Sequence, residues 1–129
     1  MAEEERRVLL AEDDRFLRRA ASARLRQQGF TVLTAEDGAE ALRMAREEQP
    51  DLILLDLIMP KMQGFEVLKA LKQDGATSRI PVIVLSNLGQ ERDVQQAMEQ
   101  GAIAYFVKAH LSLQDLVQKV GEALEAGGK

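Results

Sequence analysis

Short apolar runs alternate with longer stretches of helical periodicity along this chain, and the alternation repeats five times. The apolar runs are four or five residues long, which is typical of strands that are buried on both faces. We therefore predict strands at Val8–Ala11, Thr31–Thr34, Leu52–Asp56, Pro81–Leu85 and Ile103–Val107.

Each predicted strand is followed by a segment in which apolar residues recur three and four positions apart, as on the buried side of a helix. The last segment has the clearest stripe, which runs from Leu113 to Leu124. Strict alternation of strands and helices predicts one α/β domain whose parallel sheet is covered on both faces. We expect its core to span about residues 7–124, with a flexible tail at 125–129. The other predicted helices lie around Leu17–Leu25, Ala41–Ala45, Phe65–Leu71 and Val94–Met98.

Glycines and capping sequences fall where these helices should begin and end. Gly29, Gly75 and Gly101 each follow a predicted helix, where a residue in the left-handed region often ends the helix. The segments Asp37–Glu40 and Ser112–Asp115 have the spacing of N-terminal capping boxes. The positions of these glycines and capping sequences therefore agree with the helices predicted from the periodicity.

The composition excludes several classes of protein. The chain has 129 residues, 46% of them apolar, which suits one domain with a core of ordinary size. A net charge of -4 without any Lys/Arg run argues against direct nucleic-acid binding. The polar, acidic N-terminus does not resemble a signal peptide, and no apolar run approaches the roughly 20 residues of a membrane span. The absence of cysteine fits a reducing compartment, so we expect a cytoplasmic protein without membrane contact.

Polar side chains gather where the predicted strands end, and ligands of open parallel α/β sheets bind at that edge. Most of them have a structural explanation when taken singly; Asp14, for example, can N-cap the first helix. Asp56 is harder to explain, because it follows four apolar residues and a lone buried carboxylate is costly. The residues that end four of the five strands are Glu12-Asp13-Asp14, Asp56, Ser86-Asn87 and Lys108.

These residue types indicate phosphoryl chemistry. Clustered carboxylates repel one another unless a cation is present, and hard oxygen ligands favour Mg²⁺ in a chain with no cysteine and one histidine. Lys108 and Ser86 are suited to bind the remaining oxygens of a phosphoryl group. The cluster therefore predicts a Mg²⁺-dependent phosphoryl acceptor with Asp56 as the attacking group.

Five motifs follow one another along the chain, namely VLLAEDD, LILLDLIMPKMQGFEVL, IPVIVLS, GAIAYFVKA and the closing amphipathic helix. Together they make the sequence resemble the receiver domain of two-component response regulators. The resemblance implies a flavodoxin-like, doubly wound (βα)5 fold with strand order 2-1-3-4-5. It also implies a phosphorylation switch that catalyses its own phosphorylation and dephosphorylation, and not a turnover enzyme.

The resemblance assigns a role in metal binding, phosphorylation or switching to most of the strand-end residues. In the metal site, Asp56 is the phosphoacceptor and a Mg²⁺ ligand, together with Asp13 and the backbone carbonyl of Ile58. Glu12 would bind Mg²⁺ through water.

The switch implied by the resemblance uses three further residues. Lys108 would pair with Asp56 and then with its phosphoryl group. Ser86 would swing toward that group, and Tyr105 would turn inward into the space that is vacated. The face formed by the fourth helix, fifth strand and fifth helix would repack as a result.

The resemblance also implies partners. A histidine kinase or histidine phosphotransfer protein would donate the phosphoryl group, and the first helix, with Phe16 and Arg19, resembles its docking surface. Output would pass through the switch face, with Leu88, Val94 and Gln95, to a downstream protein target or to an effector domain absent from this sequence. Some receivers dimerise through the same face, so the resemblance also allows a homodimer.

The sequence departs from the family pattern at Lys108-Ala109, where proline usually follows the lysine, and at Asn87, where alanine or glycine is common. Because a cis bond before a residue other than proline costs about 2.5–4 kcal/mol, we predict a trans Lys108-Ala109 bond. Because of these departures, we keep as an alternative function a pseudo-receiver, which binds partners without being phosphorylated. His110, in the same loop, is interpreted as a solvated surface residue.

Two other functions fit the sequence poorly. A phosphohydrolase of the haloacid dehalogenase type needs a second Asp two residues after its nucleophile, where this chain has Ile58. A flavodoxin-like cofactor binder needs a first loop that cradles phosphate, whereas the segment Glu12–Asp14 would repel it.

Overall fold

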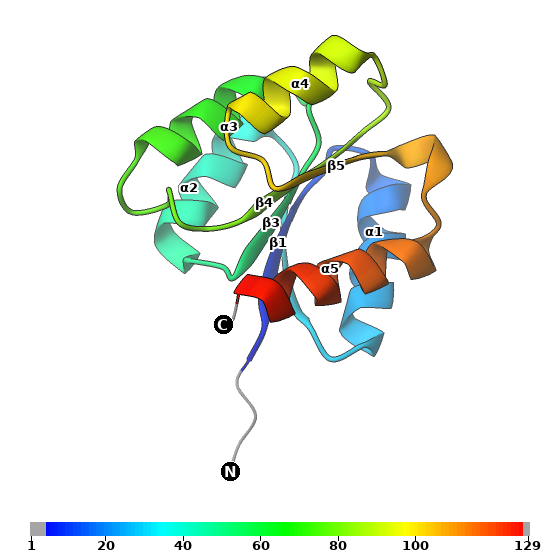
Figure 1. Ribbon diagram of the computed structural model, residues 1–129. Helices are drawn as coiled ribbons and strands as arrows, with labels where there is room; N and C mark the ends of the chain where they lie inside the picture. The colour runs from blue at the N-terminus through cyan, green and yellow to red at the C-terminus, as the bar shows by residue number, and fades with distance from the viewer. Residues whose placement is uncertain (1–4, 128–129) are drawn as a thin grey trace.

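The computed structural model describes residues 5–127, which form a parallel sheet between two layers of helices (Figure 1). The strands are β1 (Arg7–Ala11), β2 (Thr31–Ala35), β3 (Leu52–Leu55), β4 (Val82–Ser86) and β5 (Ala104–Val107). The helices are α1 (Arg15–Gln27), α2 (Gly38–Glu48), α3 (Gly64–Gln73), α4 (Glu91–Glu99) and α5 (Leu113–Gly127), with a 3-10 turn at Lys108–His110.

All four strand pairings are parallel, and the strand order β2-β1-β3-β4-β5 confirms the predicted doubly wound topology. Every predicted strand is present, with its ends displaced by at most one residue. The third strand ends at Leu55, so Asp56 is the first residue beyond it. Its backbone N–H still donates to the Ala11 carbonyl, 3.1 Å away, which keeps it in line with the sheet.

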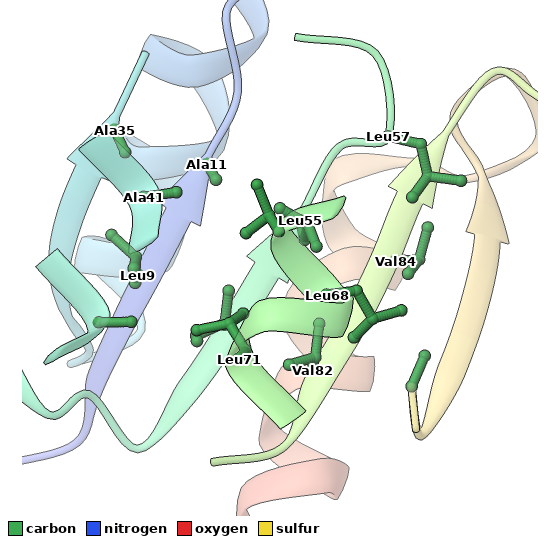
Figure 2. Packing of buried hydrophobic residues seen from close by; sticks show 14 of the residues in the cluster. Leu9, Ala11, Ala35, Ala41, Leu55, Leu57, Leu68, Leu71, Val82 and Val84 are labelled. Atoms are coloured by element: carbon green, nitrogen blue, oxygen red, sulfur yellow. The ribbon is translucent and has the colours of Figure 1, made fainter. Parts of the chain in front are cut away.

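Two apolar layers cover the sheet, one on each face. Helices α1 and α5 cover one face, and α2, α3 and α4 cover the other (Figure 1). Along β1, Val8 and Leu10 pack toward α1 and α5, while Leu9 and Ala11 join the opposite cluster. Figure 2 shows this second cluster, with Leu68 of α3 over the sheet. Burial on both faces explains why the strands lack polar alternation.

Most predicted helix ends are confirmed. Asp14 N-caps α1 by accepting hydrogen bonds from the N–H groups of Phe16 and Leu17, at 2.9 and 3.1 Å. Gly29 and Gly101 have φ angles of 94° and 110°, in the left-handed region that favours glycine.

The prediction for Gly75 is wrong, because its φ is not positive. Helix α3 already ends at Gln73, and Asp74 follows it in an extended conformation. The Asp74 carboxylate accepts the N–H of Ala76 at 2.9 Å and turns the chain in this way. The turn after α3 is therefore stabilised by the side chain of Asp74 and not by a glycine in the left-handed region.

The C-terminal region differs from prediction in one respect. Helix α5 extends to Gly127, so residues 125–127 of the predicted tail are helical, while residues 128 and 129 lie outside the described part. The Lys108-Ala109 bond is trans, as predicted, and lies in the 3-10 turn that leads into α5.

The start of α2 packs tightly against the loop between β3 and α3. The N–H of Gly38 donates to the Pro60 carbonyl at 3.3 Å. A Cβ on Gly38 would lie only 2.0 Å from the Met62 carbonyl oxygen, so no larger residue fits without a shift of backbone. Helix α2 therefore holds in place the loop that follows Asp56.

We expect Gly38→Ala to lower the free energy of unfolding by about 1–3 kcal/mol, since the added methyl group overlaps a backbone carbonyl. Gly75→Ala is the matched control, because a Cβ there would contact nothing within 4 Å. Urea denaturation of both variants checks this, and equal stability of Gly38→Ala and the wild type would contradict it.

Candidate functional site

An ammonium group that follows β5 meets two carboxylates that follow β1 and β3. Lys108 Nζ lies 2.9 Å from Asp56 Oδ2 and 2.6 Å from Glu12 Oε1. Both carboxylates are nearly inaccessible, with Glu12 only 1% and Asp56 only 4% exposed. The sequence led us to expect the contact with Asp56; the shorter contact with Glu12 was not predicted. One cation thus links the ends of three strands.

Asp56 is held from two sides. Its Oδ1 accepts the N–H of Ile58 at 3.2 Å, and its Oδ2 accepts from Lys108 Nζ. A carboxylate at the end of a buried strand is costly when it has no partner. These contacts supply the partners, because a buried carboxylate is tolerated when it is paired and hydrogen-bonded.

Three carboxylates cluster closely enough to share one metal ion. Oxygen atoms of Glu12, Asp13 and Asp56 lie within 4.8 Å of one another, and Asp13 is exposed. Glu12 Oε1 is buried, and Lys108 Nζ lies beside it at 2.6 Å. Hard oxygens with one open side fit Mg²⁺, which binds one or two carboxylates and keeps several waters. The acidic cluster therefore fits a magnesium site.

The charges in the site are unbalanced. Burial raises the pKa of Glu12 to about 7, against opposing hydrogen bonds from Lys108 and from the Asp14 N–H. Burial alone would lower the pKa of Lys108, but its hydrogen bonds to Glu12 and Asp56 outweigh burial and leave that pKa raised. Lys108 therefore stays charged at neutral pH. Its single positive charge faces the carboxyl groups of Glu12, Asp13 and Asp56. A divalent cation would relieve this excess of negative charge.

The two predicted switch residues both contact Leu88. Ser86 is fully buried at the end of β4, and its Oγ accepts the N–H of Leu88 at 3.2 Å. The Tyr105 hydroxyl, on β5, donates to the Leu88 carbonyl. Burial raises the pKa of Tyr105, so its hydroxyl keeps the proton that it donates.

The structure also reveals a contact that the sequence did not indicate. Arg18 of α1 donates from Nη1 to the backbone carbonyls of Glu12 and Asp13, at 3.0 and 3.3 Å. An arginine on an amphipathic helix is most often solvated, so residue type carries no signal of this contact. His110 and Asn87 are exposed, which agrees with the interpretation of His110 as a surface residue.

Comparison with known proteins identifies the family. Residues 8–121 match the response regulator receiver domain. The chain belongs to this receiver family. It is 37% identical over 102 residues to protein PilH of Pseudomonas aeruginosa, a match covering 79% of this chain and 84% of PilH. The receiver domain of a Francisella response regulator has the same fold, with a TM-score of 0.88 at 27% identity over 95% of this chain and 98% of that one.

Other relatives of this receiver are much longer proteins. It is 40% identical over 114 residues to a gliding motility regulatory protein of Myxococcus xanthus, which covers 88% of this chain but only 15% of that protein. A probable transcriptional regulator of Guillardia theta is matched over 41% of its length.

Receiver domains are phosphorylation switches that interact with histidine kinases and downstream effectors, and the acidic cluster here fits the magnesium site of such a domain. Within residues 5–127, no helix is both long enough and apolar enough to cross a membrane.

The raised pKa of Glu12 makes stability depend on pH. The folded protein binds this proton more tightly than the unfolded chain, in which the pKa is near the ordinary 4.5. The stabilising contribution of protonated Glu12 is therefore complete below pH 4.5 and is lost as the pH rises to about 7. In metal-free buffer, we expect Glu12→Gln to flatten the fall in the free energy of unfolding across this range, as measured by urea denaturation.

Glu99→Gln is the control for this measurement, because Glu99 is exposed on α4 and should leave the pH dependence as in the wild type. A pH dependence in Glu12→Gln as steep as in the wild type would contradict the assignment to Glu12.

Proposed function

We propose that this receiver accepts a phosphoryl group on Asp56 from the phosphohistidine of a histidine kinase or histidine phosphotransfer protein. The observation that carries the proposal is Lys108 Nζ in contact with both Asp56 and Glu12, next to an acidic cluster that fits Mg²⁺. These groups supply a nucleophile, a fixed positive charge and metal ligands at one point on the sheet edge.

The proposed reaction forms one bond and breaks another. A carboxylate oxygen of Asp56 attacks phosphorus, the bond between phosphorus and the donor's imidazole nitrogen breaks, and the imidazole keeps the electron pair and takes up a proton. The charged ammonium group of Lys108, which pairs with Asp56 before the reaction, would pair with the phosphoryl oxygens after it. Mg²⁺, held by Asp13, Asp56 and the Ile58 carbonyl, with Glu12 acting through water, would offset that charge.

We propose that the switch passes through Leu88. Ser86 would leave the Leu88 N–H for a phosphoryl oxygen, and Tyr105 would turn inward as its bond to the Leu88 carbonyl breaks. The support is that the hydroxyls of Ser86 and Tyr105 are both hydrogen-bonded to the backbone of Leu88. Movement of either side chain would therefore disturb the residue to which the other is bonded. The face of α4, β5 and α5, which includes Val94 and Gln95, would then bind a downstream target, an effector domain or a second copy.

We further propose that the donor docks on α1 with an acidic surface. This helix has five arginines and no acidic residue, in a chain whose net charge is -4. Phe16, in its first turn, is 86% exposed and lies three residues after Asp13. An apolar anchor beside a basic helix suits a partner that offers acidic groups around an apolar recess. We propose that this exchange takes place in the cytoplasm, since a chain without cysteine fits a reducing compartment.

Phosphorylation is tested by intact mass after incubation with Mg²⁺ and acetyl phosphate. We expect one added phosphoryl group on the wild type and none on Asp56→Asn, because the amide lacks the nucleophilic oxygen. Chelation of Mg²⁺ should abolish the modification of the wild type. Equal modification of Asp56→Asn would show that another residue is the acceptor.

The docking surface is tested by comparing two phosphodonors. Arg19→Glu and Phe16→Ala should slow phosphotransfer from a kinase that phosphorylates the wild type, on the order of tenfold for the charge reversal. Both variants should react with acetyl phosphate at the wild-type rate, because a small donor needs no docking surface.

Lys69→Glu is the matched control, because Lys69 is exposed on α3, in the helix layer that covers the other face of the sheet. It should react with the kinase as the wild type does. If Arg19→Glu also reacts with the kinase at the wild-type rate, docking on α1 is wrong while phosphorylation of Asp56 still stands.

A further inference from the structure

Arg18 donates to three consecutive backbone carbonyls in the loop between β1 and α1. Its Nη1 lies 3.0 Å from the Glu12 carbonyl and 3.3 Å from that of Asp13, and its own backbone N–H donates to the Asp14 carbonyl at 2.9 Å. The side chain is only 14% exposed, and Nη2 lies 3.9 Å from a carboxylate oxygen of Glu36. A single residue therefore binds the backbone of the whole acidic loop.

This loop provides two of the three clustered carboxylates, those of Glu12 and Asp13. Bonds to successive carbonyls restrict the backbone torsions that aim the side chains between them. Mg²⁺ tolerates little departure from octahedral geometry, so its affinity depends on how well the ligands are ordered before it binds.

Charge and geometry make opposite predictions for Arg18. A guanidinium close to the acidic cluster repels a divalent cation, so electrostatics alone predicts that removal of Arg18 strengthens Mg²⁺ binding. Ordering of the loop predicts that removal weakens it. The sign of the change in affinity therefore distinguishes the two roles.

We propose that Arg18 is a positioning residue, which holds the loop of Glu12 to Asp14 in the conformation that binds Mg²⁺. Its loss weakens metal binding even though a like charge is removed. This inference rests on the proposed function, since it requires that the acidic cluster binds Mg²⁺.

The test is a Mg²⁺ titration of the unphosphorylated protein, followed through the backbone amide NMR signals of residues 12–14. We expect the dissociation constant of Arg18→Met to rise about tenfold, as for loss of an outer-shell partner. Arg18→Lys should fall between Arg18→Met and the wild type, because an ammonium can donate to one of the carbonyls.

Arg15→Met is the matched control for charge. Arg15 is exposed at the first position of the same helix, so its removal takes away one positive charge without a bond to these carbonyls. Its Mg²⁺ affinity should equal that of the wild type or slightly exceed it.

Three outcomes overturn the inference: wild-type or tighter affinity in both Arg18 variants, an equal loss in Arg15→Met, or a loss in Arg18→Met that Arg18→Lys does not reduce. Should Arg18→Met fail to fold in a thermal denaturation, Arg18→Lys against the wild type decides. An absence of Mg²⁺ binding in the wild type instead refutes the magnesium part of the proposed function, so the two failures are distinguishable.

Discussion

The structure depends on one shared positive charge. Lys108 Nζ, at the end of β5, lies within 3 Å of carboxylates that follow β1 and β3, and both carboxylates are buried. Each of these groups would be expensive to bury without its partners, so their burial requires the three strand ends to meet. The same contact that makes the buried acids tolerable also places a cation where a phosphoryl group would carry its charge.

The sheet makes this meeting possible. Its strands are covered on both faces by apolar helix layers, so the polar groups of the site lie beyond the carboxyl ends of the strands. Around that row, each loop is held by a neighbour from another element. The loop after β1 is bound by Arg18, and the loop after β3 is packed against Gly38 of α2. Ser86 and Tyr105, which both contact Leu88, are the groups that the proposed switch would move.

Much of this was predictable from the sequence, because periodicity and strand-end residues are local signals. All five strands were located within one residue, and Asp56, Glu12, Asp13 and Lys108 were expected at one edge. What the sequence could not provide were contacts that depend on side-chain reach, namely Lys108 with Glu12 and Arg18 with the loop carbonyls. The turn after α3 was also assigned to the wrong residue, because Asp74 and Gly75 are both good turn formers and only the folded backbone decides between them.

The most direct test of the shared charge is a crystal structure of the protein with Mg²⁺ and beryllofluoride, which mimics an aspartyl phosphate. The account predicts beryllium bonded to a carboxylate oxygen of Asp56, with Lys108 Nζ in contact with a fluorine atom and Asp13 bound to the metal. Beryllofluoride on another carboxylate, or Lys108 turned away from it while still paired with Glu12, would contradict the central claim.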